Sequence, residues 1–168
     1  MAAKLWLIAA SFAPMTDLQV GVVDVYLIRP YRADWLVLSL QRSRETRCPG
    51  SWETVHGRIE PNERPEEAAV REVREETGLE LDRLYNVTCQ PFYLHTLGVV
   101  QMAVVFAAFV TERSNVRLGT EHQRYEWLSM ADAAVRFTWP REREALEHIR
   151  ILLGTGDAGP AEDVLRVV

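Results

Sequence analysis

The sequence alternates between two kinds of apolar pattern, and this alternation limits the folds that it can adopt. Runs rich in Val, Leu and Ile that end at turn residues predict β-strands. Two other segments, each opened by a proline, predict helices. Because the long strand-like runs are apolar at nearly every position, we expect both faces of the sheet to be buried. The sequence therefore predicts an α/β fold in which helices cover a sheet on both sides.

The predicted elements form a strand-rich body with one early and one late helix. Strands are expected at 18–30, 35–41, 52–55, 87–94, 99–110 and 125–128, and helices at 65–77 and 140–153. Pro65 suits the first turn of the early helix, and Gly78 suits its end. Arg64 precedes this helix at a position where Ser, Thr or Asp would cap it better, a difference of about 0.5–2 kcal/mol.

The 168 residues are enough for one domain with a substantial core. We expect this domain at 17–153, an N-terminal extension at 1–16 and a loose C-terminal tail at 154–168. The extension holds a short apolar run, Leu5–Ala10. This run favours either an extra strand, on the domain or across a subunit interface, or a translation start at Met15. A secretion signal is the weaker interpretation because the run is short, and no run approaches the ~20 apolar residues that span a bilayer.

The net charge of −5 is concentrated in one segment of the chain. Residues 60–80 hold eight acidic residues and three arginines, whereas the rest of the chain is balanced. This distribution argues against a nucleic-acid partner and indicates a binding site for divalent cations. The two cysteines, Cys48 and Cys89, are too few for a disulfide scaffold and lack metal-ligand spacing. We therefore expect two free thiols in a reducing cytoplasm.

Three glutamates in the early helix carry the strongest chemical signal. Glu72, Glu75 and Glu76 stand at i, i+3 and i+4, so their carboxylates project from one side of about one turn. They repel one another by roughly a few tenths of a kcal/mol per pair, which a cation among them would offset. Carboxylates suit Mg²⁺, with Mn²⁺ as the alternative. The competing interpretation is a solvated acidic face with Arg71 and Arg74 as ionic partners.

The segment around these glutamates resembles the Nudix box, GX5EX7REUXEEXGU, in which U is aliphatic. Every specified position matches between residues 57 and 79. The matching residues are Gly57, Glu63, Arg71, Glu72, Val73, Glu75, Glu76, Gly78 and Leu79. The chain is therefore similar to the Nudix hydrolases, including the MutT-like enzymes. The resemblance implies an α/β/α sandwich with a mixed sheet between helices, covering about residues 17–153.

The resemblance also implies an activity and roles for residues of the box. The expected reaction is hydrolysis of a pyrophosphate bond by a metal-activated water, in a nucleoside diphosphate linked to another group. The implied metal ligands are Glu72, Glu75, Glu76 and the carbonyl of Gly57. Glu72 is the candidate for deprotonating or orienting the water, and Arg71 and Glu76 are counted with it as catalytic. Arg71 would hold a glutamate in place, and Glu63 would play a supporting role in the preceding loop.

Four residues outside the box are further candidates. Glu121, in a late polar loop, is expected to bind metal or act as a base, with Glu126 as the competing choice. Arg42, at a strand end, is expected to contact phosphates, since an arginine in some Nudix enzymes does so. His56 and Tyr125 are the other candidate substrate-binding residues. The string WETVHGRIE around His56 resembles the branch that contains dihydroneopterin-triphosphate and dATP pyrophosphohydrolases.

Other residues near the box favour less specific interpretations. His122 is expected to be a solvated loop residue rather than a general base. Aromatic residues could stack on a base or a pterin, although each is more typical of a core position. These aromatic residues are Trp35, Trp52, Phe92, Tyr93 and Tyr125.

Three functions stay open at this level. The leading hypothesis is an Mg²⁺-dependent pyrophosphohydrolase that acts on a nucleoside triphosphate or a related molecule. The second is cleavage of a nucleotide sugar or a dinucleoside polyphosphate, which the box does not distinguish. The third is a non-catalytic, nucleotide-sensing Nudix domain, but such domains commonly lose box glutamates and all are present here. A homodimer is also expected from the resemblance, with the apolar N-terminal run as one contact.

Overall fold

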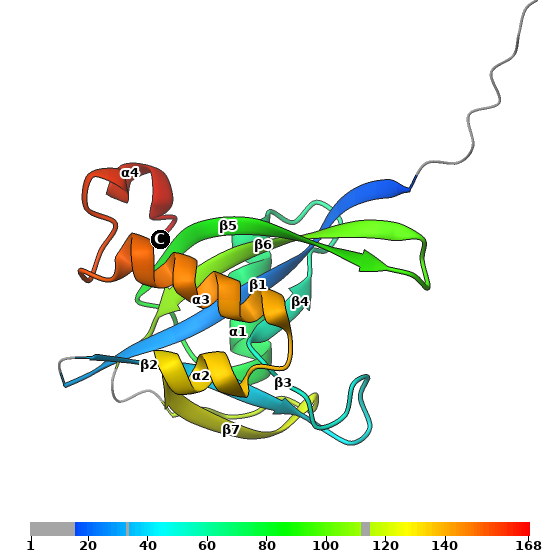
Figure 1. Ribbon diagram of the computed structural model, residues 1–168, viewed down its shortest axis with the longest axis horizontal. Coiled ribbons are helices and arrows are strands. Elements are labelled where there is room, and N and C mark those ends of the chain that lie inside the picture. The colour runs from blue at the N-terminus through cyan, green and yellow to red at the C-terminus, as the bar shows by residue number, and fades with distance from the viewer. Residues whose placement is uncertain (1–15, 33, 112–114) are drawn as a thin grey trace, which may run out of the picture.

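The computed structural model describes residues 16–32, 34–111 and 115–168 (Figure 1). Its strands are β1 (Asp17–Tyr31), β2 (Asp34–Arg42), β3 (Trp52–Glu53), β4 (Val55–Arg58), β5 (Arg83–Leu94), β6 (Val99–Phe109) and β7 (His122–Ser129). Its helices are α1 (Pro65–Thr77), α2 (Met130–Arg136), α3 (Pro140–Leu153), the 3₁₀ helix η1 (Gly159–Ala161) and α4 (Glu162–Leu165). The predicted extension, except Thr16, lies outside the described residues, as does its proposed contact.

The strands form one mixed sheet with β1 near its centre. The main path runs β3-β2-β1-β6-β5, with β4 paired to β1 and β7 paired to β2. β1 and β6 are parallel, and the other pairs are antiparallel. The α/β class and the mixed sheet predicted from the sequence are confirmed.

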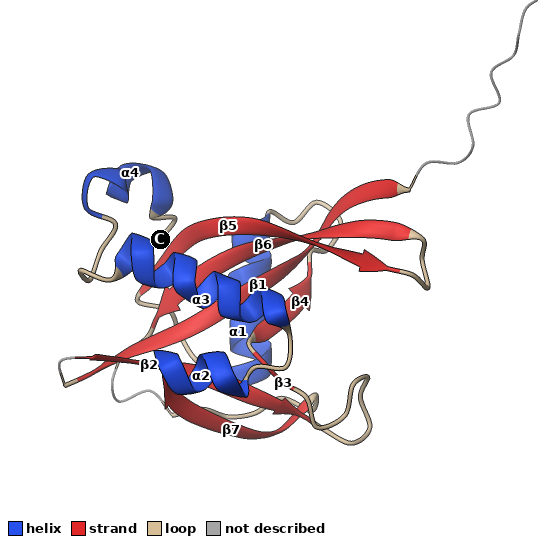
Figure 2. Cartoon of the chain, in the orientation of Figure 1, coloured by secondary structure: helices blue, strands red, loops and turns tan. Residues whose placement is uncertain are grey.

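Strand β1 is buried on both faces, which explains why its sequence lacks polar alternation. Successive side chains of a strand point to opposite faces of the sheet. Val23 and Leu27 therefore pack in the core that contains residues of α1. Tyr26 and Ile28 pack in a second core, with residues of α2 and α3. Figure 2 shows α1 on one side of the sheet and α2 and α3 on the other, so the predicted layers are confirmed.

Both predicted helices are confirmed with their bounds. Strands β5 and β7 begin earlier than predicted, at Arg83 and His122, and three other segments differ in kind. Residues 52–55 form two short strands, because the N–H of Thr54 between them donates to the Glu142 carboxylate (2.9 Å). Helix α2 was not predicted, and its cap is the Ser129 hydroxyl, which accepts from the Asp132 N–H (3.1 Å). The expectation of a loose tail is wrong within the described residues, since its end forms backbone hydrogen bonds with Leu84 (2.8 and 3.1 Å).

Parts of three strands extend beyond the helices as an arm (Figure 1). The arm consists of Asp17–Val20 of β1, Pro91–Leu94 of β5 and 99–102 of β6. Leu18 pairs with Val100 and Val20 with Met102, and these residues of β6 pair with Tyr93 and Pro91 on the other side. Paired residues share a face of the sheet, so one face of the arm is apolar.

Within the described ranges, no helix has the length and apolar character needed to cross a membrane.

Candidate active site

Helix α1 is fastened at both ends beside the sheet. Glu67 accepts a hydrogen bond from the backbone N–H of Arg64 (2.9 Å), which compensates in part for the missing cap side chain. Gly78 ends the helix with a φ of 66°, in the left-handed region that favours glycine. The N–H of Gly119 donates to the Glu76 carbonyl (2.9 Å). This bond brings the loop that carries Glu121 to the end of α1.

Arg71 joins the loop before α1 to the glutamates of the helix. Its Nε and Nη2 donate to the two carboxylate oxygens of Glu63 at 2.8 and 2.9 Å. Its Nη1 donates to Glu72 at 2.7 Å and to Glu75 at 3.3 Å. The hydrogen bonds from Arg71, with that from the Glu60 N–H, lower the pKa of Glu63 to about 2. These contacts are those that a holding role for Arg71 and a supporting role for Glu63 require.

Gly57 lies on β4, directly against the side chain of Glu72. A β-carbon at position 57 would overlap the Cγ, Cδ and Oε1 atoms of Glu72. The box glycine is therefore required by packing, because only glycine leaves room for this carboxylate over the β4 backbone. Burial raises the pKa of Glu72; Arg71 opposes this shift, and the negative charges of Glu75 and Glu121 add to it.

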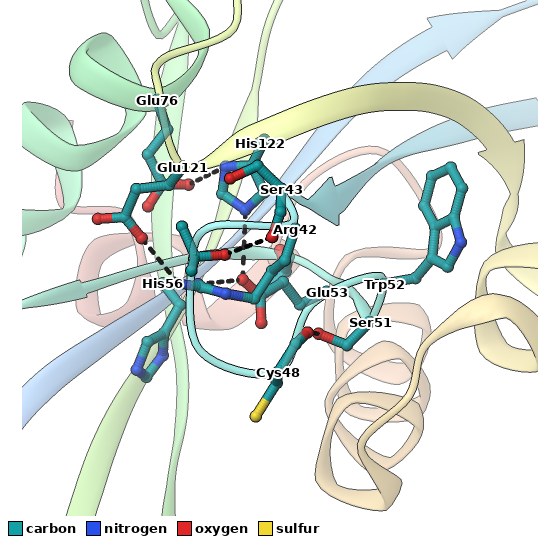
Figure 3. A network of polar contacts seen from close by, with 12 residues as sticks. Arg42, Ser43, Cys48, Ser51, Trp52, Glu53, His56, Glu76, Glu121 and His122 are labelled. Atoms are coloured by element: carbon teal, nitrogen blue, oxygen red, sulfur yellow. Dashed lines mark hydrogen bonds and ion pairs between the residues drawn. The ribbon is translucent and has the colours of Figure 1, made fainter.

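Glu76 is buried and points toward two residues from distant parts of the chain, Glu53 and His122 (Figure 3). Its Oε2 lies 3.7 Å from Nδ1 of His122, whose Nε2 lies 3.2 Å from Oε1 of Glu53. Burial raises the pKa of Glu76 well above its ordinary value, and the charges of Glu72, Glu53 and Glu121 raise it further. The expectation of a solvated His122 is wrong, because β7 starts at this residue and directs its ring inward.

Arg42 is held by carboxylates of this same network. Its Nη1 donates to Glu53 at 2.7 Å, its Nη2 to Glu121 at 3.0 Å, and its Nε to the carbonyl of Arg47 at 2.7 Å. Burial opposes ionisation of Glu53, but hydrogen bonds from His122 and Arg42 outweigh it and lower the pKa of Glu53. The predicted phosphate contact of Arg42 would therefore compete with Glu121, whose side chain is the exposed partner.

A second polar cluster surrounds His56. Its Nδ1 lies 2.5 Å from Oδ1 of Asp24, a fully buried residue of β1. Arg141 of α3 forms an ion pair with the other oxygen of Asp24, and its guanidinium lies over the ring of Phe92. The ring of Phe92 lies 6.4 Å from that of His56. His56 thus belongs to a charged cluster beside an aromatic ring. This environment is compatible with the substrate-binding role, which stays a prediction.

The carboxylates of the site suit a divalent cation, although they do not form a ready-made cage. Among the described residues, no three His, Cys, Asp or Glu side chains converge into a metal-binding group. Oε2 of Glu76, however, is buried without a hydrogen-bond partner. A buried carboxylate oxygen of this kind requires a partner, and hard oxygen donors suit Mg²⁺ or Mn²⁺. Glu76 and Glu72 are the best-placed donors, since their side chains are mostly buried, whereas those of Glu75 and Glu121 are more than half exposed.

The remaining predicted residues do not join this network. Tyr125 is half exposed on β7, and no hydrogen bond, ion pair or ring contact links it to another candidate in the described part of the chain. Glu126 pairs instead with Arg124 and Arg136 (both 2.6 Å). Cys48 and Cys89 are free and exposed, as expected. The sequence interpretation missed Glu53, which contacts Arg42 and His122, and the pair of Asp24 with Arg141, which contacts His56.

Comparisons with known proteins identify the family. A sheet between helices, with an acid-rich helix packed on one face, defines an α/β/α domain of the Nudix type. The family model described as NUDIX domain matches residues 18–149. The chain belongs to the Nudix family.

Curated relatives carry several different names. A protein named octanoyltransferase from Myxococcus xanthus is 31% identical over 127 residues, which are 74% of this chain and 35% of that protein. Dihydroneopterin triphosphate diphosphatase from Escherichia coli is 29% identical over 128 residues, 68% of this chain and 83% of that protein. The chain spans only 35%, 39% and 58% of the first three relatives that it matches, so their full activities belong to longer proteins.

Solved structures share the fold. An Ap4A hydrolase from C. elegans, in a binary complex, superimposes with a TM-score of 0.71 at 21% identity, covering 82% of this chain and 99% of that one. The dihydroneopterin triphosphate pyrophosphohydrolase of E. coli gives a TM-score of 0.65 at 25% identity, covering 77% and 94%.

Proposed function

We propose that the chain hydrolyses a pyrophosphate bond in a nucleoside triphosphate or a related nucleoside diphosphate derivative, with Mg²⁺ as the cofactor. The observation that carries the proposal is a complete Nudix box in which Glu72 packs against Gly57 and Glu76 is buried beside His122. Membership of the family supports the reaction class. Mn²⁺ is the alternative cofactor, since the donors are all oxygens.

The residues of the site divide the work as follows. Glu72, Glu76 and the Gly57 carbonyl would hold the cation, with Glu75 and Glu121, the more exposed carboxylates, as further donors. When bound, the cation neutralises phosphate oxygens and lowers the pKa of a water. Glu72 would orient a water or accept its proton, since its carboxylate lies against the Gly57 backbone at the centre of the box. Arg71 keeps Glu72 directed toward Gly57 through its hydrogen bond at 2.7 Å.

The substrate is proposed from the His56 cluster. Arg141 and Phe92 offer a flat cationic and aromatic surface next to His56, on which a pterin or a nucleobase could stack. The relative named dihydroneopterin triphosphate diphosphatase favours a triphosphate substrate of this kind. Relatives named bis(5'-nucleosyl)-tetraphosphatase favour the second candidate, a dinucleoside polyphosphate.

Incubation with a substrate panel tests the proposal. The panel contains dihydroneopterin triphosphate, dATP, a dinucleoside tetraphosphate and a nucleotide sugar, each with Mg²⁺. We expect a monophosphate and pyrophosphate from one of the triphosphates. ATP released from the tetraphosphate, or a sugar phosphate, would favour the second candidate instead. Nucleotide binding without any hydrolysis would favour a sensing domain.

We also propose a cytoplasmic location and a homodimer. The two exposed free thiols, Cys48 and Cys89, suit a reducing compartment. The apolar face of the arm supports a dimer, because Leu18, Val20 and Tyr93 are 67%, 61% and 59% exposed there. Two such faces, free of charge in a chain of net charge −5, can pack on each other without repulsion. Sedimentation of wild type and Val20→Asp tests this: we expect a dimer that the aspartate dissociates, and a monomeric wild type would refute it.

A further inference from the structure

His122 and Glu53 come from β7 and β3, outside the box. The two side chains contact each other, and the His122 ring faces the carboxylate of Glu76 (Figure 3). The three residues are almost completely buried, with exposed fractions of 5% for His122, 6% for Glu53 and 7% for Glu76. Charged and polar groups are rarely buried to this extent unless they are paired. Their contacts therefore need an explanation.

The hydrogen bonds of Glu53 fix the orientation of the His122 ring. Oε1 of Glu53 accepts from Nη1 of Arg42 at 2.7 Å and lies 3.2 Å from Nε2 of His122. Because an ionised carboxylate only accepts, Nε2 of His122 carries the hydrogen of this bond. The ring is held at this edge, and its other nitrogen, Nδ1, faces Oε2 of Glu76 at 3.7 Å.

The two facing atoms are unusual, because Nδ1 of His122 and Oε2 of Glu76 are both buried without a hydrogen-bond partner. Most buried polar atoms in proteins have such a partner. A hydrogen bond from the backbone of His56 lowers the pKa of Glu76, against the larger effect of burial. The Glu76 carboxylate is thus bordered by the His56 backbone on β4 and by the His122 ring, and these neighbours limit its rotation.

We propose that His122, held by Glu53, is a positioning residue that sets the direction of the Glu76 carboxylate. This inference rests on the proposed function, which makes Glu76 a metal ligand. Residues that orient a ligand from behind typically change metal affinity by about 10- to 100-fold when they are replaced. His122 and Glu53 are therefore expected to affect metal binding although neither is placed among the ligands.

Two variants of one residue separate positioning from mere packing. In His122→Asn the amide group lies near the place of Nδ1 and keeps a polar group toward Glu76. In His122→Gln the amide group lies near the place of Nε2 and keeps the bond to Glu53. We expect Mn²⁺ binding, measured by calorimetry without substrate, to weaken about tenfold or more in His122→Gln and to stay within about threefold of wild type in His122→Asn. With substrate, kcat should follow the same order while KM stays nearly unchanged.

The reverse order, with His122→Gln like wild type and His122→Asn impaired, would overturn the proposal, because only the structural bond to Glu53 would then matter. Equal Mn²⁺ binding by both variants and wild type would also overturn it. If both variants fail to fold, His122→Phe tests the same contact, because it keeps a ring but removes the polar atom that faces Glu76: weaker Mn²⁺ binding supports positioning, and unchanged binding refutes it. A wild-type chain that binds no Mn²⁺ would instead refute the proposed function itself.

Discussion

The side chain of Glu72 fills the space that a β-carbon on Gly57 would need. One residue comes from a strand and the other from the middle of α1. The packing of the helix on the sheet therefore depends on a position without a side chain, and the direction of the Glu72 carboxylate depends on the same position.

Replacing Gly57 by alanine should displace the Glu72 carboxylate. We expect kcat to fall by about 100-fold, since a misplaced catalytic group can cost this much, while the chain stays folded. Gly21→Ala is the control, because its added β-carbon would meet only the end of the flexible Gln101 side chain. Steady-state kinetics on the hydrolysed substrate would measure both, and a fully active Gly57→Ala would show that Glu72 does not need its present direction.

Arg71→Lys should weaken the site because lysine lacks the fork that bonds both oxygens of Glu63. We expect only a small decrease in the free energy of unfolding, because the pair is partly exposed to solvent and such pairs contribute little. Mn²⁺ binding should weaken as Glu72 loses its partner. Arg74→Lys, in an exposed pair with Glu80, is the matched control and should change neither quantity. Urea unfolding and calorimetry measure the two effects; identical behaviour of both variants would argue against a holding role.

Arg42→Ala distinguishes the two roles considered for Arg42. If the arginine mainly neutralises buried Glu53, its loss should lower the free energy of unfolding by about 2–4 kcal/mol, because one charge stays buried without its cation. If it mainly contacts phosphates, KM should rise and stability should be unchanged. We expect urea unfolding to show the loss of stability. Glu121→Gln removes the exposed partner of Arg42 and should be nearly as stable as wild type.

Glu142 should make stability fall as pH rises. Burial raises its pKa from 4.5 to about 7, although the N–H of Thr54 and the charge of Arg141 oppose this shift. The folded state therefore binds the proton more tightly, and its advantage is lost between about pH 4.5 and 7, by roughly 3 kcal/mol. Glu142→Gln should remove this dependence, and Glu144→Gln, on the exposed side of α3, should retain it. Urea midpoints at pH 5 and pH 8 measure the effect, and a Glu142→Gln curve that falls as steeply as that of wild type would contradict it.

The elements that can be predicted from the sequence are those whose ends are marked by residues nearby in the chain. Pro65 and Gly78 mark the ends of α1, and Pro140 starts α3, so both helices were predicted with their bounds. Helix α2 has only seven residues, too few for its period to stand out, and its Ser129 cap was overlooked. The tail was misread because its order depends on Leu84 and on Glu162, which accepts from the Tyr85 hydroxyl at 2.9 Å. Such long-range pairs leave no periodic signal.

The same distinction applies to the site. The box residues share one 23-residue segment, so their spacing alone indicates a shared face of a helix. Glu53 and His122 are 69 positions apart, and only the pairing of β2 with both β3 and β7 brings them together. Asp24 did leave a signal, since it is a single acid within the otherwise apolar run VVDVYLI. A lone charge in a buried strand indicates a buried partner, and Arg141 and His56 supply it.

The most direct test of the central claim is Mn²⁺ titration of wild type and Glu76→Gln by calorimetry, with thermal unfolding measured in parallel without metal. We predict that wild type binds Mn²⁺ and that Glu76→Gln binds at least about tenfold more weakly. Without metal, the melting temperature of Glu76→Gln should equal or exceed that of wild type, because the substitution removes a buried carboxyl whose pKa is raised by burial and by acidic neighbours. Equal Mn²⁺ affinity of the two proteins would contradict the account, since Glu76 would then hold no cation.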